Sequence, residues 1–204
     1  MELIEMRQKL EALALEVSSH LPAEWTLQPP REDRDDNDHK RFCNSLGMCF
    51  SIRWDWRTRE RIVATAWEWP TYKKLERGEV RSQTIRPRDL WDPKETGSHD
   101  ITVAYSRGAK ALAEEIKRRL LPEYERVWKR CKEKADNYQQ HEDKAEAQWQ
   151  EVCKLLGKDA TRKSHYNAIG SLSIDDRNGS LHIEGYISFE DLKKLAALGL
   201  QPRS

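Results

Sequence analysis

Residues 107–156 read RGAKALAEEIKRRLLPEYERVWKRCKEKADNYQQHEDKAEAQWQEVCKLL, a run with helical periodicity that covers about a quarter of the chain. The sequence therefore predicts a long charged helix over about residues 108–156, with Pro122 either in the first turn of a new helix or at a kink. After Pro122, two series of positions recur every seven residues, offset by four: Tyr124, Cys131, Tyr138, Ala145 and Val152, and Trp128, Ala135, Glu142, Trp149 and Leu156. We call these positions the helix seam, because this alternation is typical of a helix that presents one stripe to a partner.

The seam consists of aromatic and small residues, and Glu142 interrupts it. Two interpretations stay open. The seam can pack within the chain, or it can join two copies in a homodimer, although aromatic seams specify oligomers less well than Leu/Ile seams do. If the helix contacts a protein partner, the candidate contact residues are Trp128, Arg130, Lys134, Tyr138, Glu142 and Trp149.

Residues 41–69 predict a long β-hairpin with its turn at Arg57–Glu60. That turn sets Trp54 opposite Val63 and gathers the apolar residues on one face, namely Leu46, Met48, Phe50, Ile52, Trp54 and Trp56 with Val63, Thr65, Trp67 and Trp69. This face needs a cover, which either the N-terminal helix or the later helix can supply.

The remaining elements complete an α+β fold. Helical spacing predicts an amphipathic helix over residues 2–20, and a strand is expected at Ile101–Tyr105 with Ser106 as the following N-cap. The turn signal Asn178-Gly179 lies inside a predicted ββα unit. The expected organisation is an N-terminal α+β domain at 1–121, a long connecting helix at 122–157 and the ββα unit at 158–204.

Composition sets limits on the class of protein. Hydrophobic residues make up 37% of the chain and charged residues 35%, but eight tryptophans supply enough apolar area for a modest core. The formal charge of +1 gives no general attraction to nucleic acid or to anionic membranes. No apolar run is long enough for a membrane span, and the first residues do not form a signal peptide.

Residues for catalysis or metal binding do not form a recognisable pattern. The chain has no GxSxG, HExxH or phosphate-binding glycine loop, and no histidine pair at ligand spacing. We therefore expect no catalytic residues, no metal site and no cofactor. The four cysteines include no CxxC pair, which favours a reduced cytosolic protein, while their even number leaves a disulfide open.

Single-stranded nucleic acid is the alternative ligand, because arginine next to aromatic residues is the combination that grips single strands. The hairpin end supplies Arg53, Trp54, Trp56, Arg57, Arg59 and Arg61, and the basic segment 73–94 adds Lys73, Lys74, Arg77, Arg81, Arg86 and Arg88. The predicted register places the tryptophans on the apolar face, so Trp67 and Trp69 are expected in the core. For Trp54 and Trp56, core and binding surface stay equally open.

One run resembles a known group of proteins. Ile101–Arg107 (ITVAYSR), followed by Ala111–Pro122 (ALAEEIKRRLLP) and Glu123-Tyr124, resembles small proteins encoded on bacteriophages, prophages and plasmids, over about residues 40–156. The resemblance carries no catalytic motif. It implies a bacterial cytoplasm and an accessory gene of a mobile element.

The leading hypothesis is a non-enzymatic protein that binds a bacterial protein or protein–nucleic-acid complex and inhibits or modulates a defence system, as anti-CRISPR proteins do. The alternative is an accessory protein that binds single-stranded nucleic acid through the Arg/Trp hairpin and the segment 73–94.

Overall fold

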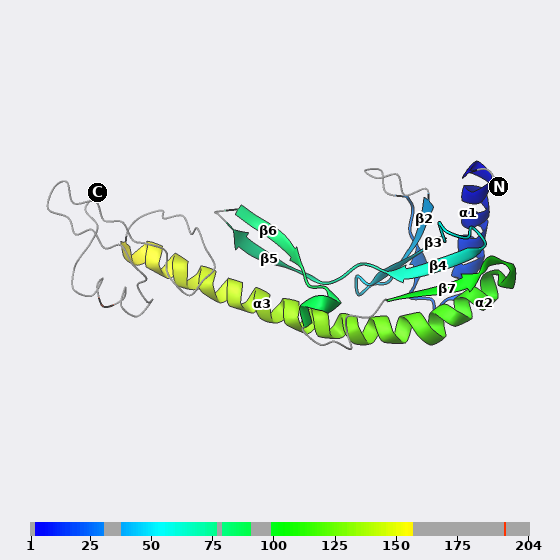
Figure 1. The fold of residues 1–204 in the computed structure, drawn as a ribbon. Coiled ribbons are helices and arrows are strands. Elements are labelled where there is room, and N and C mark those ends of the chain that lie inside the picture. Colours follow the sequence, from blue (N-terminus) through cyan, green and yellow to red (C-terminus); the bar gives the residue numbers. More distant parts are fainter. Residues whose placement is uncertain (1–2, 31–37, 77–78, 91–98, 157–193, 195–204) are drawn as a thin grey trace. The chain divides into compact units, whose positions relative to one another are not determined.

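A computed structural model describes residues 3–30, 38–76, 79–90, 99–156 and 194, and shows an α+β protein (Figure 1). This confirms the predicted fold class, the N-terminal helix, the antiparallel sheet and the long helix. The elements are α1 (Leu3–His20), β1 (Thr26–Leu27), β2 (His39–Cys43), β3 (Cys49–Trp54), β4 (Arg61–Ala66), β5 (Thr71–Glu76), β6 (Glu79–Thr84), η2 (Pro87–Leu90), β7 (Asp100–Ala104), η4 (Tyr105–Arg107), α2 (Gly108–Glu115), η5 (Ile116–Leu120) and α3 (Leu121–Leu156). The predicted ββα unit lies outside the described residues, Lys194 apart.

The chain divides into two compact units. The first unit contains Met1–Pro70 and Ile85–Glu133, and the second contains Thr71–Thr84 and Lys134–Ser204. The β5–β6 hairpin therefore belongs to a different unit from the strands on either side of it in the sequence.

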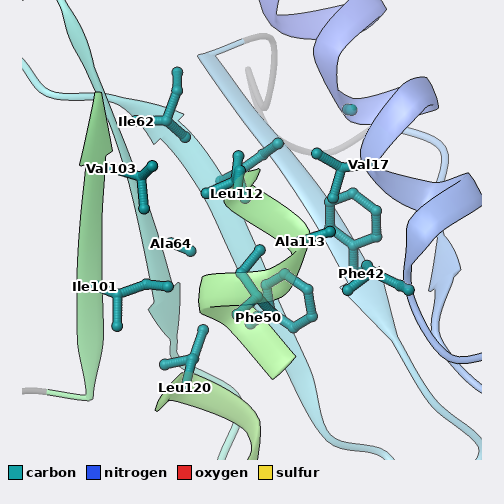
Figure 2. Close-up of a cluster of buried hydrophobic side chains, with 14 of the residues drawn as sticks. Val17, Phe42, Phe50, Ile62, Ala64, Ile101, Val103, Leu112, Ala113 and Leu120 are labelled. Atoms are coloured by element: carbon teal, nitrogen blue, oxygen red, sulfur yellow. The ribbon is translucent and has the colours of Figure 1, made fainter. Parts of the chain in front are cut away.

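The first unit is built on an antiparallel five-stranded sheet with the order β1-β2-β3-β4-β7. Helix α1 packs on β1, β2 and β3, while α2 and η5 pack on β4 and β7, so helices cover one face. Figure 2 shows the buried side chains between these layers, where Phe50 and Leu112 lie close to the small side chains of Ala64 and Ala113. The alanines are fully buried, which lets strand and helix approach closely.

The β3–β4 register differs by one residue from the predicted one. Trp54 pairs with Ile62 and Phe50 with Ala66, because the loop between Asp55 and Arg61 holds five residues, 56–60, instead of the four of Arg57–Glu60. A slip of one residue moves every side chain of a strand to the opposite face. The core face of β4 therefore carries Ile62, Ala64 and Ala66, and the predicted placement of Val63 and Thr65 on that face is wrong.

A second turn, between β2 and β3, was not predicted. Leu46 and Met48 lie in or beside this turn instead of on a long first strand. The Asn44 side chain accepts hydrogen bonds from the backbone N–H groups of Leu46 and Met48, both at 3.0 Å, and Gly47 adopts a φ of 81° that favours glycine. The turn sets Cys43 opposite Cys49, and these two cysteines form a disulfide. The preference for reduced cysteines therefore does not hold for this pair.

Reduction of the Cys43–Cys49 disulfide should lower the free energy of unfolding by about 2 kcal/mol, because the bond closes only a short loop. Urea titrations with and without a thiol reductant measure the difference. A double variant, Cys43→Ser with Cys49→Ser, should unfold like the reduced wild type and ignore the reductant. Identical titration curves for oxidised and reduced wild type would show that the crosslink contributes nothing.

The long helical run is continuous from Gly108 to Leu156, with a π-helical segment in front of Pro122. The N–H of Leu121 donates to the carbonyl of Ile116, which widens the turn just before a proline that has no N–H to donate. The predicted start of the helix is confirmed at Gly108. The expected capping by Ser106 is wrong, since Arg107 occupies the N-cap position and no side chain caps the helix.

Tyr124 anchors the first part of α3 to the end of β3. Its ring is fully buried, and its hydroxyl accepts a hydrogen bond from the N–H of Cys49 at 3.0 Å. The same oxygen lies within hydrogen-bond distance of the Cys49 carbonyl and donates to the Glu68 carbonyl. Trp69 meets the Tyr124 ring edge-on, with centroids 5.2 Å apart, so this tryptophan packs against the core as predicted.

The second unit contains the β5–β6 hairpin and the later part of α3. The Tyr72 and Tyr138 rings lie 5.1 Å apart, and the backbone N–H of Lys73 donates to the Gln139 side chain at 2.8 Å. The sequence did not predict this two-stranded sheet.

Candidate binding surface

The β3–β4 tip, residues 55–60, is an ordered turn. The Asp55 carboxylate accepts hydrogen bonds from the Arg57 backbone N–H at 3.0 Å and from the Thr58 hydroxyl at 3.4 Å. The backbone N–H of Arg59 donates to the Asp55 carbonyl at 2.9 Å, and Arg59 has a φ of 52°. The Asp55 carboxylate therefore holds the turn together and does not form an ion pair with the neighbouring arginines.

Trp56 stands at this tip with 71% of its surface exposed. The Arg57 guanidinium lies over the indole ring, 4.9 Å from its centroid, in a cation–π contact. A tryptophan held out into solvent is costly unless something covers it, so an exposed indole marks a candidate contact point.

The four arginines of the tip lack counter-ions. Among the described residues, no ion pair involves Arg53, Arg57, Arg59 or Arg61. Elsewhere on the first unit, several cations have a carboxylate partner. Arg118 and Arg119, for example, both pair with Glu115, whose pKa is held below its ordinary value by the hydrogen bond from Arg118. Positive charge is therefore uncompensated at the tip.

A groove of about 310 Å³ runs beside Trp56, between the start of α1 and the ends of β2 and β3. We call it the tip groove. It is lined by Leu3, Met6, Arg7, Leu10, Asp38, His39, Arg53, Trp54, Trp56 and Arg59. Leu3 is 57% exposed at its edge, whereas Leu10 and Met6 are buried beneath it. The groove combines an apolar floor with a mainly cationic rim.

The structure decides between the two interpretations of Trp54 and Trp56. Trp54 is buried, its indole N–H donates to the Met6 carbonyl at 2.9 Å, and its ring lies 4.8 Å from that of Tyr105. Trp54 is therefore a core residue, which decides the alternative that was open for it. Trp56 keeps the surface role.

The basic segment 73–94 is divided between the two units. Lys73, Lys74 and Arg81 belong to the second unit, and Arg81 pairs with Glu79 at 2.9 Å. Arg86 and Arg88 are exposed on the first unit, and Arg77 lies outside the described residues. The predicted basic residues therefore belong to two separate units, and the hairpin tip belongs to the first.

The helix seam is used within the chain over its first part, which confirms the intramolecular interpretation there. Trp128 is buried in the core of the first unit, so its predicted contact with a partner is wrong. Arg130 is half-buried in the same unit. In the second unit Tyr138 is 40% exposed beside Tyr72, Lys134 lies 5.7 Å from the Tyr138 ring centroid, and Glu142 is half-buried. The side chain of Trp149 is not described.

A second hollow, of about 300 Å³, lies beside β2. It is lined by Glu11, Leu27, Gln28, Pro29, Pro30, His39, Lys40 and Arg41. Lys40 forms an ion pair with Glu11, and burial lowers the pKa of the Lys40 ammonium. Glu11 neutralises Lys40, but Arg41 also lines this hollow, and its Nε and Nη1 atoms are buried without a hydrogen-bond partner among the described residues.

Neither recognisable metal sites and membrane spans nor comparisons with known proteins identify this chain. Within the part of the chain that the structure describes, no group of His, Cys, Asp or Glu side chains could hold a metal ion, and no helix is both long and apolar enough to span a membrane. No protein family, curated protein or solved structure matches this chain.

Sequence reasoning missed the contribution of α1 to this surface. The helical periodicity placed Leu3 and Ile4 on the apolar side, yet both are largely exposed, at 57% and 68%. The signal in the sequence was the pair of large apolar side chains in the first turn of an amphipathic helix. Leu3 lines the tip groove only because the tip lies beside α1 in the folded unit.

Proposed function

We propose that this chain is a non-enzymatic accessory protein of a mobile genetic element that binds a bacterial defence complex and inhibits or modulates it, in the way that anti-CRISPR proteins act. The observation that carries the binding role is the exposed Trp56 among four arginines without counter-ions, beside an apolar groove. Tryptophan and arginine dominate the residues that supply most of the energy in protein interfaces. The mobile-element context comes from the sequence resemblance.

The proposal moves the contact surface from the helix seam to the tip groove. Trp128 and Tyr124 are buried in the first unit and have no surface to offer a partner. The tip has the opposite properties, since its indole and its arginines are exposed on a turn that Asp55 holds in one conformation. A preorganised surface loses less entropy on binding than a disordered one.

Expression of the chain in bacteria that carry a defined defence system should raise the plating efficiency of a phage that this system restricts. The Trp56→Ser variant should lose most of this effect, because truncation of a central interface tryptophan costs about 2 kcal/mol or more of binding energy. Leu15→Ser is the matched control, since Leu15 is also an exposed apolar residue but lies outside the groove.

The same variants can be compared by affinity capture of the purified defence complex. Wild type and Leu15→Ser should retain the complex, and Trp56→Ser should not. If wild type protects against no defence system in a representative panel and captures none of the purified complexes, the proposed inhibitory function is wrong.

Binding of single-stranded nucleic acid remains the second candidate, favoured by the Arg57 guanidinium over the Trp56 ring. It predicts that a labelled single-stranded oligonucleotide binds at low ionic strength and dissociates steeply as salt rises. Loss of this binding in Trp56→Ser would assign it to the tip. An absence of binding even at low salt would dismiss it.

The proposed location is the bacterial cytoplasm, where thiols are normally kept reduced. The Cys43–Cys49 disulfide of the structure is unusual for that compartment, and on reduction the two cysteines would stay at facing positions of β2 and β3. The tip groove lies at the other end of β3 from Cys49, so we expect binding to tolerate either state.

A further inference from the structure

The tip groove has the dimensions and the lining of a site for one large side chain. Its volume of about 310 Å³ is at the lower end for ligand pockets. The floor is apolar, since Met6, Leu10 and Trp54 are 8%, 0% and 9% exposed. Leu3 and Trp56 rise at the edge with most of their surface in solvent. An apolar side chain of a partner that enters the groove would cover Leu3 and Trp56 and remove their exposed apolar surface from water.

The charges that face the groove select for an anionic partner. Among the described residues that line it, three are arginines, Arg7, Arg53 and Arg59, and one is a carboxylate, Asp38, which pairs with Arg7 at 2.8 Å. Arg53 and Arg59 carry the uncompensated charge, because neither forms an ion pair with a described residue. His39 also lines the groove and adds no negative charge.

A peptide suits this arrangement better than a nucleic-acid strand does. Sequence-independent grip of a strand relies on several aromatic platforms in succession. Only Trp56 offers one at the groove, because Trp54 is buried and its N–H is bonded to Met6.

We propose that the tip groove binds an acidic peptide segment of the partner protein, which inserts one large apolar side chain and sets its flanking carboxylates on Arg53 and Arg59. This rests on the proposed function and names the partner's chemistry. Carboxylates that meet an uncompensated guanidinium form charge-assisted hydrogen bonds, while the inserted side chain supplies the hydrophobic contact.

Selection from a displayed random-peptide library on the full chain tests this inference. We expect the selected peptides to share one Phe, Trp, Leu or Met next to two or more Asp or Glu residues. Their affinity should fall as salt rises, because exposed charges are screened. Fluorescence anisotropy of a labelled selected peptide, with a labelled single-stranded oligonucleotide in parallel, gives the affinities.

Matched variants locate the site. Trp56→Ser and Arg59→Glu should each weaken peptide binding at least about tenfold. Leu15→Ser, like Trp56→Ser, replaces an exposed apolar side chain by serine, and Arg88→Glu is the same charge reversal as Arg59→Glu. Both residues lie away from the groove, so these variants should leave peptide binding unchanged. Because all four positions are exposed, circular dichroism should show wild-type folding for every variant.

Three outcomes would overturn the inference. These are a library with no enriched peptide, enriched peptides without acidic residues, and peptides that bind Trp56→Ser as tightly as wild type. Tighter binding of the oligonucleotide than of any peptide would also overturn it and favour the second candidate. Peptide binding at the groove without any effect on defence complexes would leave this inference standing and reject the proposed function, so the two failures are distinguishable.

Discussion

Replacement of Trp54 by alanine should lower the free energy of unfolding by about 3–5 kcal/mol, the usual cost of removing a large aromatic side chain from a core. Trp54 is 9% exposed and packs against Tyr105 with ring centroids 4.8 Å apart. The indole N–H also donates to the Met6 carbonyl, which fixes α1 to the end of β3. The variant would leave a cavity and remove the hydrogen bond that joins β3 to α1.

Trp56 provides the matched control, two positions further along the chain. Trp56→Ala should change stability by less than about 0.5 kcal/mol, because the side chain is 71% exposed. Urea denaturation followed by circular dichroism measures both variants. Equal losses for the two would contradict the assignment of Trp54 to the core and Trp56 to the surface, and a larger loss for Trp56 would reverse it.

The second large effect is expected at Tyr124. Tyr124→Phe keeps the ring but removes the hydroxyl, so the Cys49 N–H and the Glu68 carbonyl lose a buried partner. An unsatisfied buried polar group costs about 1–3 kcal/mol, and we expect a loss of about 2–3 kcal/mol in total. Tyr138→Phe is the control, since Tyr138 is 40% exposed and should lose less than about 0.5 kcal/mol. A Tyr124→Phe variant as stable as wild type would show that these hydrogen bonds contribute nothing.

The pH dependence of stability gives Tyr124 an independent signature. Burial raises the pKa of the Tyr124 phenol in the folded protein, so the unfolded chain releases this proton first as pH rises. The contribution of the protonated phenol is then complete below its ordinary pKa of about 10 and is lost progressively above it. The stability difference between wild type and Tyr124→Phe should therefore shrink above about pH 10, as measured by urea titrations across that range.

Local patterns predicted the elements that depend on neighbours in the chain. The apolar spacing of α1, the strand at β7 and the start of the long helix at Gly108 all agree with the structure to within a residue or two. The β5–β6 hairpin was missed because its strands have no buried alternation to detect, since β6 is almost entirely exposed.

The candidate site was predicted only in part. The Arg/Trp composition of the tip pointed to a binding surface, and Trp56, Arg57, Arg59 and Arg61 are indeed exposed there. The contribution of Leu3 was not foreseen, because α1 and the tip are separated by about 50 residues of sequence and meet only in the folded unit.

Periodicity and composition act over short distances along the chain, so they predicted the main helices, the region of the β3–β4 hairpin, the strand β7 and the concentration of arginine around residues 53–61. Only the tertiary structure decided the β3–β4 register, the Cys43–Cys49 pairing and the different fates of Trp54 and Trp56. The physical reason is that a strand has a period of two, so one extra residue in a turn exchanges its two faces, and burial then depends on which helix covers which face.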